Sequence, residues 1–555
     1  MSDTGTNDLT PTVFVLYGAT GDLARRMVLP AFFQLAQHGL LPDEWRLIGS
    51  GRGERTDEEF VEHVRGALEE FGPAPEDGPW DEFRTRLRFA GGGFTADDPG
   101  RLLDVVGKAR AEIGEEAQLV HYLSLPPKAF TGYTEALGAH GLAEGSRVVY
   151  EKPFGDSPEG FRELDDLVHS VFDEEQVFRI DHFLGKEGTQ DLHALRFANG
   201  LFEHIWSREH IAQVQIDVPE DLDVADRAEF YDATGATLDM LVTHLFQVAA
   251  EVAMEPPVSF KADDILAARE SVLSKFRPLQ PEDVVLGQFD GYRELDGVPD
   301  DSDTDTFVAA RLCIDSGRWR GVPFLLRTGK KMAAKQQRVS LVLHRPKGPV
   351  DDVPANGNVV SLSLAGAGSV DIDVMAKKPG PDLAMAPARV SLDLSKIPGG
   401  EPLPPYVSLI HDVLVGDRSL FTTSEGLAQT WRALQPVLDA TPEVHRYTPA
   451  RGDRRRPTSW PASTAGCWGR PKTEGRRGTA PLRAGEGPFV VVGPDRALVA
   501  SRRFAHPGLQ APDRGRGGVP QRQLSSGARG HRSPGPDVVH RTRGGRTDTR
   551  GGGLS

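Results

Sequence analysis

Several features that define other protein classes are scarce or missing in these 555 residues. The two cysteines, Cys313 and Cys467, cannot build a disulfide-rich scaffold, and such sparse use of cysteine is typical of a reducing compartment. No run of about 18 apolar residues occurs, and Met1–Thr12 is polar, which argues against a transmembrane helix and a secretory signal. The sequence therefore predicts a cytoplasmic protein without a membrane segment.

Positive charge is also scarce outside the last hundred residues. Residues 451–555 hold 21 Lys and Arg against 7 Asp and Glu, whereas residues 1–450 hold 43 basic against 73 acidic side chains. An acidic body of this kind argues against broad binding to nucleic acid. Metal-ligand spacing between His, Cys and acidic residues is missing as well, so no metal centre is predicted.

The first part of the chain alternates short apolar runs with helical patterns. The run Val13–Tyr17 ends at a glycine and is followed by a helical stretch to about His38, which is typical of a buried parallel strand entering a helix. Such alternation predicts a Rossmann-like, doubly wound parallel sheet. Further strands are expected at 45–49, 119–125 and 147–150, and further helices at about 57–71, 97–113 and 128–140.

The glycine motif after the first strand predicts a dinucleotide site. Two glycines allow a tight turn close to a pyrophosphate, and the helix start offers free N–H groups. The second strand ends in Gly-Ser-Gly-Arg52, with no carboxylate at the tip to bind a ribose diol. An arginine there favours a 2′-phosphate, so NADP is predicted rather than NAD. The expected cofactor-binding residues are Gly18, Thr20, Gly21, Asp22, Leu23, Ala24, Arg52 and Lys152, the last of which follows the strand at 147–150.

The segment 177–186 combines one carboxylate, one imidazole and one ammonium within six residues. Asp181, His182 and Lys186 are embedded among apolar residues, where polar side chains need partners. Lysine and histidine beside a glycine suit a compact anion such as a phosphate, and a neighbouring carboxylate can orient a base. Taken alone, the same decapeptide also fits a salt-bridged turn without chemical function.

The pattern changes after about residue 175. Residues 237–254 carry an apolar stripe typical of one amphipathic helix, with His244 off that stripe. A histidine in that position can point into a cleft, but is more often solvated or capping. Strict alternation at 339–343 and 370–374 predicts a large, mainly antiparallel sheet with one buried face. A basic cluster that includes Lys330 surrounds Gly329. We therefore expect an α+β second domain.

Together these motifs resemble glucose-6-phosphate dehydrogenases over about residues 10–449. The resemblance rests on Gly18-Ala-Thr-Gly-Asp-Leu-Ala24, Glu151-Lys-Pro-Phe-Gly155, Arg179-Ile-Asp-His-Phe-Leu-Gly-Lys-Glu187, Leu195-Arg-Phe-Ala-Asn199, Thr243-His-Leu-Phe-Gln247 and Arg327-Thr-Gly-Lys330.

The resemblance implies oxidation of glucose 6-phosphate at C1 by NADP⁺, the first step of the oxidative pentose phosphate pathway. His244 is the implied base, and Asp181 is its implied carboxylate partner. The resemblance also places Asp239 in the same site as His244, although five residues of α-helix would leave these two side chains about 140° apart. A homodimer or homotetramer is also implied. The implied substrate-binding residues are Lys152, His182, Lys186, Glu220, Asp239 and Lys330.

One residue departs from the family pattern. Phe183 stands where the family often has a tyrosine, so one hydroxyl donor to the phosphate is missing. Two other interpretations remain open. One is another Rossmann-type sugar dehydrogenase, and the other is an inactive homologue whose basic tail binds nucleic acid.

The tail does not continue the family pattern. Glycine and proline make up 31 of residues 451–555, and every basic residue there except Lys472 is arginine, a composition expected of disorder. Such a tail could bind RNA or an acidic partner, but the abrupt change at about 450 favours translation out of frame. The predicted organisation is a disordered N-terminus (1–11), an NADP-binding domain (12–175), a substrate and oligomerisation domain (176–449) and the tail (450–555).

Overall fold

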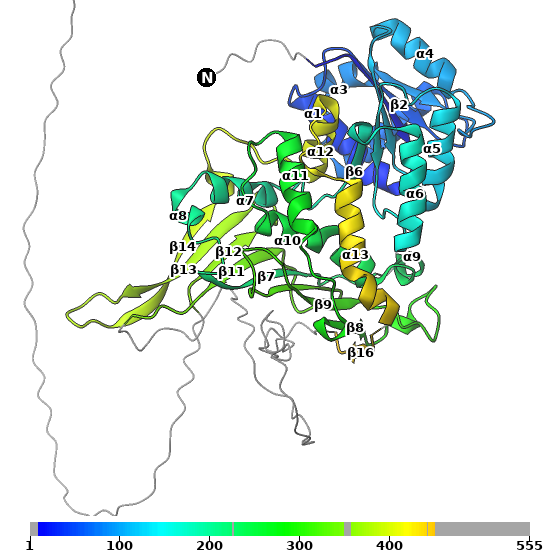
Figure 1. Ribbon diagram of the computed structural model, residues 1–555. Coiled ribbons are helices and arrows are strands. Elements are labelled where there is room, and N and C mark those ends of the chain that lie inside the picture. Colours follow the sequence, from blue (N-terminus) through cyan, green and yellow to red (C-terminus); the bar gives the residue numbers. More distant parts are fainter. Residues whose placement is uncertain (1–8, 225–226, 349–356, 441, 450–555) are drawn as a thin grey trace, which may run out of the picture. The chain divides into compact units, whose positions relative to one another are not determined.

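The computed structural model describes residues 9–224, 227–348, 357–440 and 442–449 (Figure 1). Most of the predicted N-terminal segment and the whole tail from 450 onward lie outside these residues, so the predictions made for them are not tested. Within the described ranges, no helix has the length and apolar character needed to cross a membrane.

The first sheet is the predicted doubly wound sheet. Its order is β15-β6-β5-β4-β1-β2-β3, and β1 to β6 are mutually parallel. Alternate residues of β1 enter two different hydrophobic clusters on opposite faces, which is why the strand is apolar at every position. The strands are β1 (Thr12–Tyr17), β2 (Trp45–Ser50), β3 (Leu87–Ala90), β4 (Gln118–Leu123), β5 (Arg147–Tyr150), β6 (Val177–Ile180) and β15 (Phe421–Thr422).

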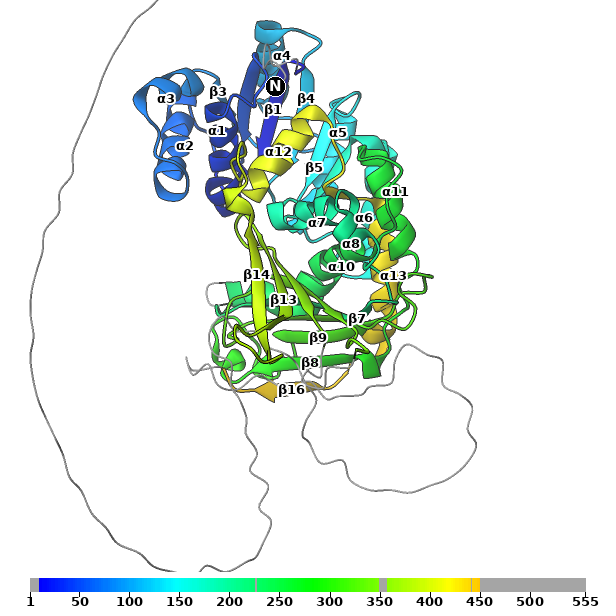
Figure 2. The ribbon, with the colours of Figure 1, turned by 90° about the vertical axis from the view of Figure 1, so that its left-hand side faces the viewer.

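The helices between these strands cover both faces of the sheet (Figures 1 and 2). The helix after β1 opens with a π-helical turn, η1, in which the Leu29 N–H donates to the carbonyl of Ala24. Helices α3 and α6 and strands β3, β6 and β15 were not predicted. The elements are η1 (Ala24–Val28), α1 (Leu29–Gln37), α2 (Asp57–Phe71), α3 (Asp77–Arg84), α4 (Leu102–Ile113), α5 (Phe130–Ala139) and α6 (Pro158–Val171).

The first sheet extends beyond the predicted boundary at 175. Strand β6 pairs with β5, and β15 pairs antiparallel with β6 although more than 200 residues separate them. Helix α12 (Pro405–Val415) also returns to pack against α1. Hydrophobic periodicity reports local structure only, so it could not show that the chain comes back to this sheet.

The second sheet is large and mainly antiparallel, as predicted. Its order is β14-β13-β12-β11-β7-β10-β9-β8-β16, with parallel pairing only at β7–β10 and β8–β16 among the described strands. The strands are β7 (Ile211–Pro219), β8 (Val284–Phe289), β9 (Phe307–Leu312), β10 (Phe324–Gly329), β11 (Arg338–Leu343), β12 (Val359–Ser363), β13 (Ser369–Lys377), β14 (Met385–Asp393) and β16 (Val444–Tyr447).

Helices pack on one face of this sheet (Figure 2). The single helix predicted over 237–254 is in fact a π-helix, η5 (Thr237–Leu245), followed by α10 (Phe246–Ala253). Asp305 anchors its start, because its carboxylate accepts hydrogen bonds from the N–H and the hydroxyl of Thr237 at 2.9 and 2.8 Å. The other helices are α7 (Glu187–Phe197), α8 (Gly200–Glu203), α9 (Ala228–Asp232), α11 (Ala262–Leu273) and α13 (Ser424–Ala440).

The turn after β1 requires a glycine for two reasons. Gly18 has φ +71°, and a Cβ there would lie 2.3 Å from the carbonyl oxygen of Ser124. Gly39, at the end of α1, has φ +66° but would place its Cβ in open space. Comparing alanine substitutions at the two positions therefore separates the cost of backbone strain from the cost of steric overlap.

We predict that Gly39→Ala lowers the free energy of unfolding by about 1–2 kcal/mol, the cost of a left-handed non-glycine residue. Gly18→Ala should lower it by a further 1–3 kcal/mol or so, because the loop must also move away from Ser124. Urea unfolding of both variants and the wild type measures the difference. Equal losses would show that the close approach to Ser124 costs nothing.

Candidate active site

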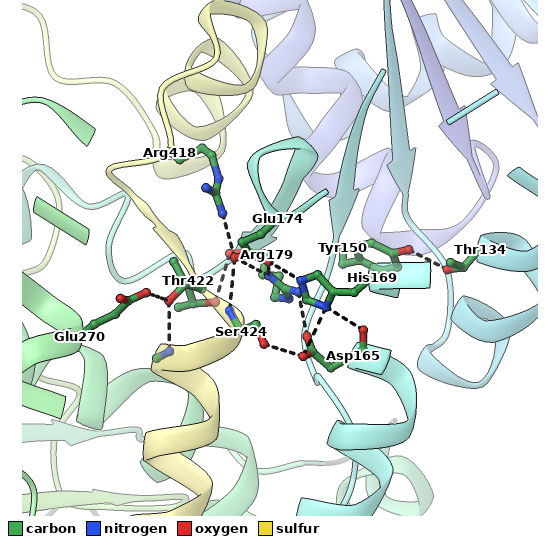
Figure 3. Close-up of polar contacts among 12 residues, drawn as sticks. Thr134, Tyr150, Asp165, His169, Glu174, Arg179, Glu270, Arg418, Thr422 and Ser424 are labelled. Atoms are coloured by element: carbon green, nitrogen blue, oxygen red, sulfur yellow. Dashed lines mark hydrogen bonds and ion pairs between the residues drawn. The ribbon is translucent and has the colours of Figure 1, made fainter. Parts of the chain in front are cut away.

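An ion network fixes the strand that leads into the site (Figure 3). Arg179 on β6 is almost fully buried and donates to both carboxylate oxygens of Glu174 and to Asp165 at 2.8–3.0 Å. Arg418 also donates to Glu174, and the Ser424 hydroxyl donates to Asp165. These contacts tie α6, β6, β15 and α13 together, and removing one partner of such a buried network leaves an uncompensated charge. The end of β6 is therefore held firmly in place.

Asp181, directly after β6, meets His244 on η5. The Asp181 Oδ1 atom lies 2.7 Å from His244 Nδ1 and also accepts a hydrogen bond from the Phe183 N–H at 2.8 Å. His244 has no exposed surface, which corrects the expectation of a solvated or capping histidine. Because a carboxylate can only accept here, Nδ1 carries the proton and Nε2 is left as the acceptor.

The second nitrogen of His244 is free to act as a base. Within the described residues Nε2 is buried and has no hydrogen-bond partner, and the same holds for Asp181 Oδ2. Burial lowers the pKa of His244, and the neighbouring Asp181 opposes this shift. The imidazole is therefore neutral near pH 7 and ready to accept a proton.

The π-helical geometry of η5 places Asp239 near His244. In a π-helix the hydrogen bonds run from residue i to residue i+5, so residues five apart lie on the same side. Here the Phe246 N–H donates to the carbonyl of Leu241. The wide angle expected from an α-helix therefore does not apply, and His244 lies close enough to contribute to the lowered pKa of Asp239.

One lysine–carboxylate pair adjoins the histidine, and a second pair lies near the first. Lys152, after β5, donates to the Asp239 carboxylate at 2.7 Å and to its backbone carbonyl at 3.2 Å. Burial alone would raise the pKa of Asp239, but Lys152 outweighs it and the pKa is lowered. Lys330, at the end of β10, forms an ion pair with Glu220, at the end of β7. The parallel pairing of β7 and β10 brings this second pair together.

A corner of basic residues, made of His182 and Lys186, lies next to His244. The rings of His182 and His244 are 4.5 Å apart, and burial, followed by His244, Lys152 and Lys186, lowers the pKa of His182 well below its usual value. Burial also lowers the pKa of Lys186 to about 8, and the charge of Lys335 adds to this effect. An anion placed here would relieve both costs.

The sequence analysis missed two residues of this corner. Lys335 approaches Lys186 closely enough to influence its pKa, and Gln337 accepts a hydrogen bond from the Lys186 ammonium at 2.7 Å. Both lie between β10 and β11, five and seven residues beyond Lys330. Their spacing in the sequence did not predict a place in the site, because only the folded connection between the two strands brings them near Lys186 at the start of α7.

Phe183 takes a structural part in the same corner. Its ring centroid lies 4.8 Å from that of His244 and 4.4 Å from the Lys186 ammonium, a cation–π distance. The ring therefore supports both the base and a cation, although it offers no hydroxyl donor.

The glycine loop and the tip of β2 fit a nucleotide phosphate. Gly21 is exposed, and its N–H bonds to the Gly18 carbonyl at 2.8 Å, which closes the turn. Arg52 is exposed at the tip of β2, whereas the Glu54 carboxylate is turned against Gly91. The site therefore presents a positive group to a 2′-phosphate, without a carboxylate aimed at the same place.

Three potential metal ligands also meet in the folded chain. Donor atoms of Asp181, His182 and His244 lie within 4.8 Å of one another, the one such group found among the described residues. Sequence spacing could not reveal it, because His244 comes from a distant element. The absence of a metal centre stays a prediction, and loss of hydride from an alcohol requires no metal.

Comparison with known proteins identifies relatives along most of the chain. A family model described as "Glucose-6-phosphate dehydrogenase, NAD binding domain" matches residues 15–191, and one described as "Glucose-6-phosphate dehydrogenase, C-terminal domain" matches residues 193–466. The second match continues past residue 449, where we had expected the resemblance to end. The residues from 450 to 466 lie outside the described ranges.

Individual relatives agree with these matches. Glucose-6-phosphate 1-dehydrogenase 2 of Mycobacterium tuberculosis is 37% identical over 452 residues, covering 77% of this chain and 88% of the relative. The cytoplasmic isoform 5 of Arabidopsis thaliana is 34% identical over 446 residues, covering 76% of this chain and 85% of the isoform.

Solved structures are similar as well. The crystal structure of glucose-6-phosphate 1-dehydrogenase from Mycobacterium avium has a TM-score of 0.71 and 34% identity, covering 79% of this chain and 94% of that one. A glucose-6-phosphate dehydrogenase in complex with its substrate glucose-6-phosphate has a TM-score of 0.74 and 28% identity, covering 81% of this chain and 97% of that one.

Behind Lys152, a buried carboxyl group joins β5 to α12. Glu151 accepts hydrogen bonds from the hydroxyls of Tyr122 at 2.6 Å and Tyr406 at 3.3 Å. Burial raises the pKa of Glu151 to about 7, although the two tyrosines and Lys152 act in the opposite direction. Because the folded state raises this pKa, the stability contributed by the proton is present at low pH and is lost as the pH rises through about 7.

We predict that the wild type loses stability relative to Glu151→Gln between pH 5 and pH 8, by about 2–3 kcal/mol. Chemical unfolding of both proteins across this range measures the difference. Replacing the exposed Glu116 by glutamine is the matched control and should leave the pH dependence unchanged. A difference between wild type and Glu151→Gln that stays constant with pH would contradict the raised pKa.

Proposed function

This chain belongs to the glucose-6-phosphate dehydrogenase family, and we propose that it oxidises glucose 6-phosphate at C1 to 6-phosphogluconolactone with reduction of NADP⁺ to NADPH. In this family the reaction opens the oxidative pentose phosphate pathway. The observation that carries the proposal is the buried Asp181–His244 pair, in which Nε2 has no partner among the described residues and the imidazole ring lies close to Lys152 and His182.

The proposed chemistry moves one proton and one hydride. His244 Nε2 takes the proton of the C1 hydroxyl, while Asp181 holds the ring in the required tautomer and stabilises the imidazolium that forms. Bound NADP⁺ supplies the hydride acceptor for C1. Loss of both leaves the C1–O bond as the carbonyl of the lactone.

The remaining polar residues bind and orient the sugar phosphate. We assign the phosphate to His182 and Lys186, with Lys330 as the third cation, and the sugar hydroxyls to Asp239, Glu220 and Lys152. Lys152 and Lys330 are already paired with these carboxylates, so the site is prepared before the sugar enters. Binding energy from the remote phosphate can then align C1 with the base.

We assign the nucleotide to the carboxyl edge of the first sheet. Gly18, Thr20, Gly21, Asp22, Leu23 and Ala24 form the pyrophosphate turn, and Arg52 binds the 2′-phosphate. Lys152 lies at the same edge after β5 and contacts both cofactor and substrate in this proposal. This assignment is supported by the exposure of Gly21 and Arg52 and by the position of the Glu54 carboxylate, which lies against Gly91.

An absorbance assay for reduced nicotinamide tests the proposal directly. We predict turnover of glucose 6-phosphate with NADP⁺ in preference to NAD⁺, and a fall in kcat of roughly 10²- to 10⁴-fold in His244→Ala. His244→Asn fills more of the buried space and should lose activity to a similar extent.

The exposed His204→Ala is the matched control and should retain wild-type kcat. A kcat within tenfold of wild type in both His244 variants would refute the assignment of the base. If the wild type turned over free glucose as well as glucose 6-phosphate, another sugar dehydrogenase activity would fit better.

A homo-oligomer, dimer or tetramer, is also proposed. The last strand of the second sheet, β14, is an edge strand that exposes Val390 (58%) and Leu392 (47%) on one side. Exposed apolar side chains on an unpaired edge favour association with a second copy. A cytoplasmic location remains part of the proposal and rests on the low cysteine content.

Analytical ultracentrifugation tests the oligomer. We expect the wild type to sediment as a dimer or larger, and Val390→Asp combined with Leu392→Asp to shift it towards monomer by placing charges at the buried contact. Leu201→Asp, at another strongly exposed leucine, is the control and should not change the mass. A monomeric wild type would refute the proposal.

A further inference from the structure

Tyr231, on α9, has a buried hydroxyl that nothing in the described structure satisfies. The residue is 6% exposed, and its Oη atom has no hydrogen-bond partner. Its ring packs in a small cluster with Val224, Ala228, Phe289 and Tyr292. In the same cluster the Tyr292 hydroxyl donates to Asp232 at 3.0 Å, so a partner is available to one tyrosine and not to the other. A buried donor without a partner is rare in folded proteins and calls for an explanation.

Tyr231 lies near residues that we assign above to the sugar hydroxyls, Asp239 and Glu220, and to the phosphate, Lys330. The Lys330 ammonium lies 5.5 Å from the centroid of the Tyr231 ring. The carboxylates of Asp239 and Glu220 lie near enough to help raise the pKa of the phenol, after burial and Asp305. The phenol therefore keeps its proton at neutral pH and can act as a donor.

We propose that Tyr231 Oη donates a hydrogen bond to a ring hydroxyl of the bound hexose phosphate, and that it thereby selects the sugar against the matching deoxy analogue. This inference rests on the proposed function and assigns a further specificity-determining residue to the same site. A buried polar group that is satisfied only by the correct substrate rejects an analogue that leaves it unpaired. Asp239 and Glu220 can accept hydrogen bonds from sugar hydroxyls, whereas the phenol complements them by donating to a sugar oxygen.

The test combines Tyr231→Phe with substrates that each lack one hydroxyl. We expect the variant to raise KM for glucose 6-phosphate about 3- to 10-fold, with kcat nearly unchanged, because one neutral hydrogen bond is lost in both ground and transition states. Kinetics with 2-deoxy-, 3-deoxy- and 4-deoxyglucose 6-phosphate then locate the contact. For the analogue that lacks the contacted hydroxyl, wild type and variant should have equal KM.

Calorimetric binding of the same four sugar phosphates gives a second readout that does not depend on turnover. If the wild type binds but does not oxidise glucose 6-phosphate, the proposed function fails while the role of Tyr231 in binding is still measured. Tyr292→Phe is the matched control from the same cluster, and it should lower the melting temperature without changing KM. Unchanged affinity in Tyr231→Phe, or the same loss for all four sugars, would overturn the inference.

Discussion

The hydrogen bond between Asp181 and His244 joins parts of the chain that belong to different sheets. Asp181 follows the last parallel strand of the first sheet, and His244 lies on the π-helix that packs against the second. Both side chains are buried, and a buried polar group needs a hydrogen-bond partner. Each of the two residues supplies a partner for the other. The hydrogen bond forms only while β6 and η5 keep their positions, so the contacts that hold these two elements also maintain the pair.

Two sets of polar contacts hold these elements. The Arg179 network fixes β6 against α6 and α13, and Asp305 holds the first residue of η5. Neither set is assigned a contact with the substrate, yet both determine where the carboxylate and the imidazole meet. The π-helical geometry adds a third constraint, because it turns Asp239 towards the same side as His244 and so places Lys152 there as well.

The electrostatics of the site follow from this arrangement. Burial lowers the pKa values of His182 and Lys186, so placing positive charge in the corner costs free energy that a bound anion would offset. Lys152 and Lys330 are instead paired with the carboxylates of Asp239 and Glu220. In the assignment proposed above, the phosphate therefore meets one lysine that is already paired, Lys330, and one, Lys186, whose hydrogen-bond partner is the neutral amide of Gln337. Tyr231, with its unsatisfied hydroxyl, lies near Asp239 and Glu220, to which we assign the sugar hydroxyls.

The sequence by itself determined the elements whose signal is local. The apolar run before Gly18, the arginine at the tip of β2 and the alternation in β11 and β13 are readable because they depend on neighbours within a few residues. Motif resemblance added the candidate residues, but it could not say how they meet. Only the tertiary structure decided that β15 returns to the first sheet, that His244 is fully buried, and that Lys335, Gln337 and Tyr231 border the site. The physical reason is that these contacts join residues far apart in the chain, and a π-helix differs from an α-helix by a hydrogen-bond register that hydrophobic periodicity does not resolve.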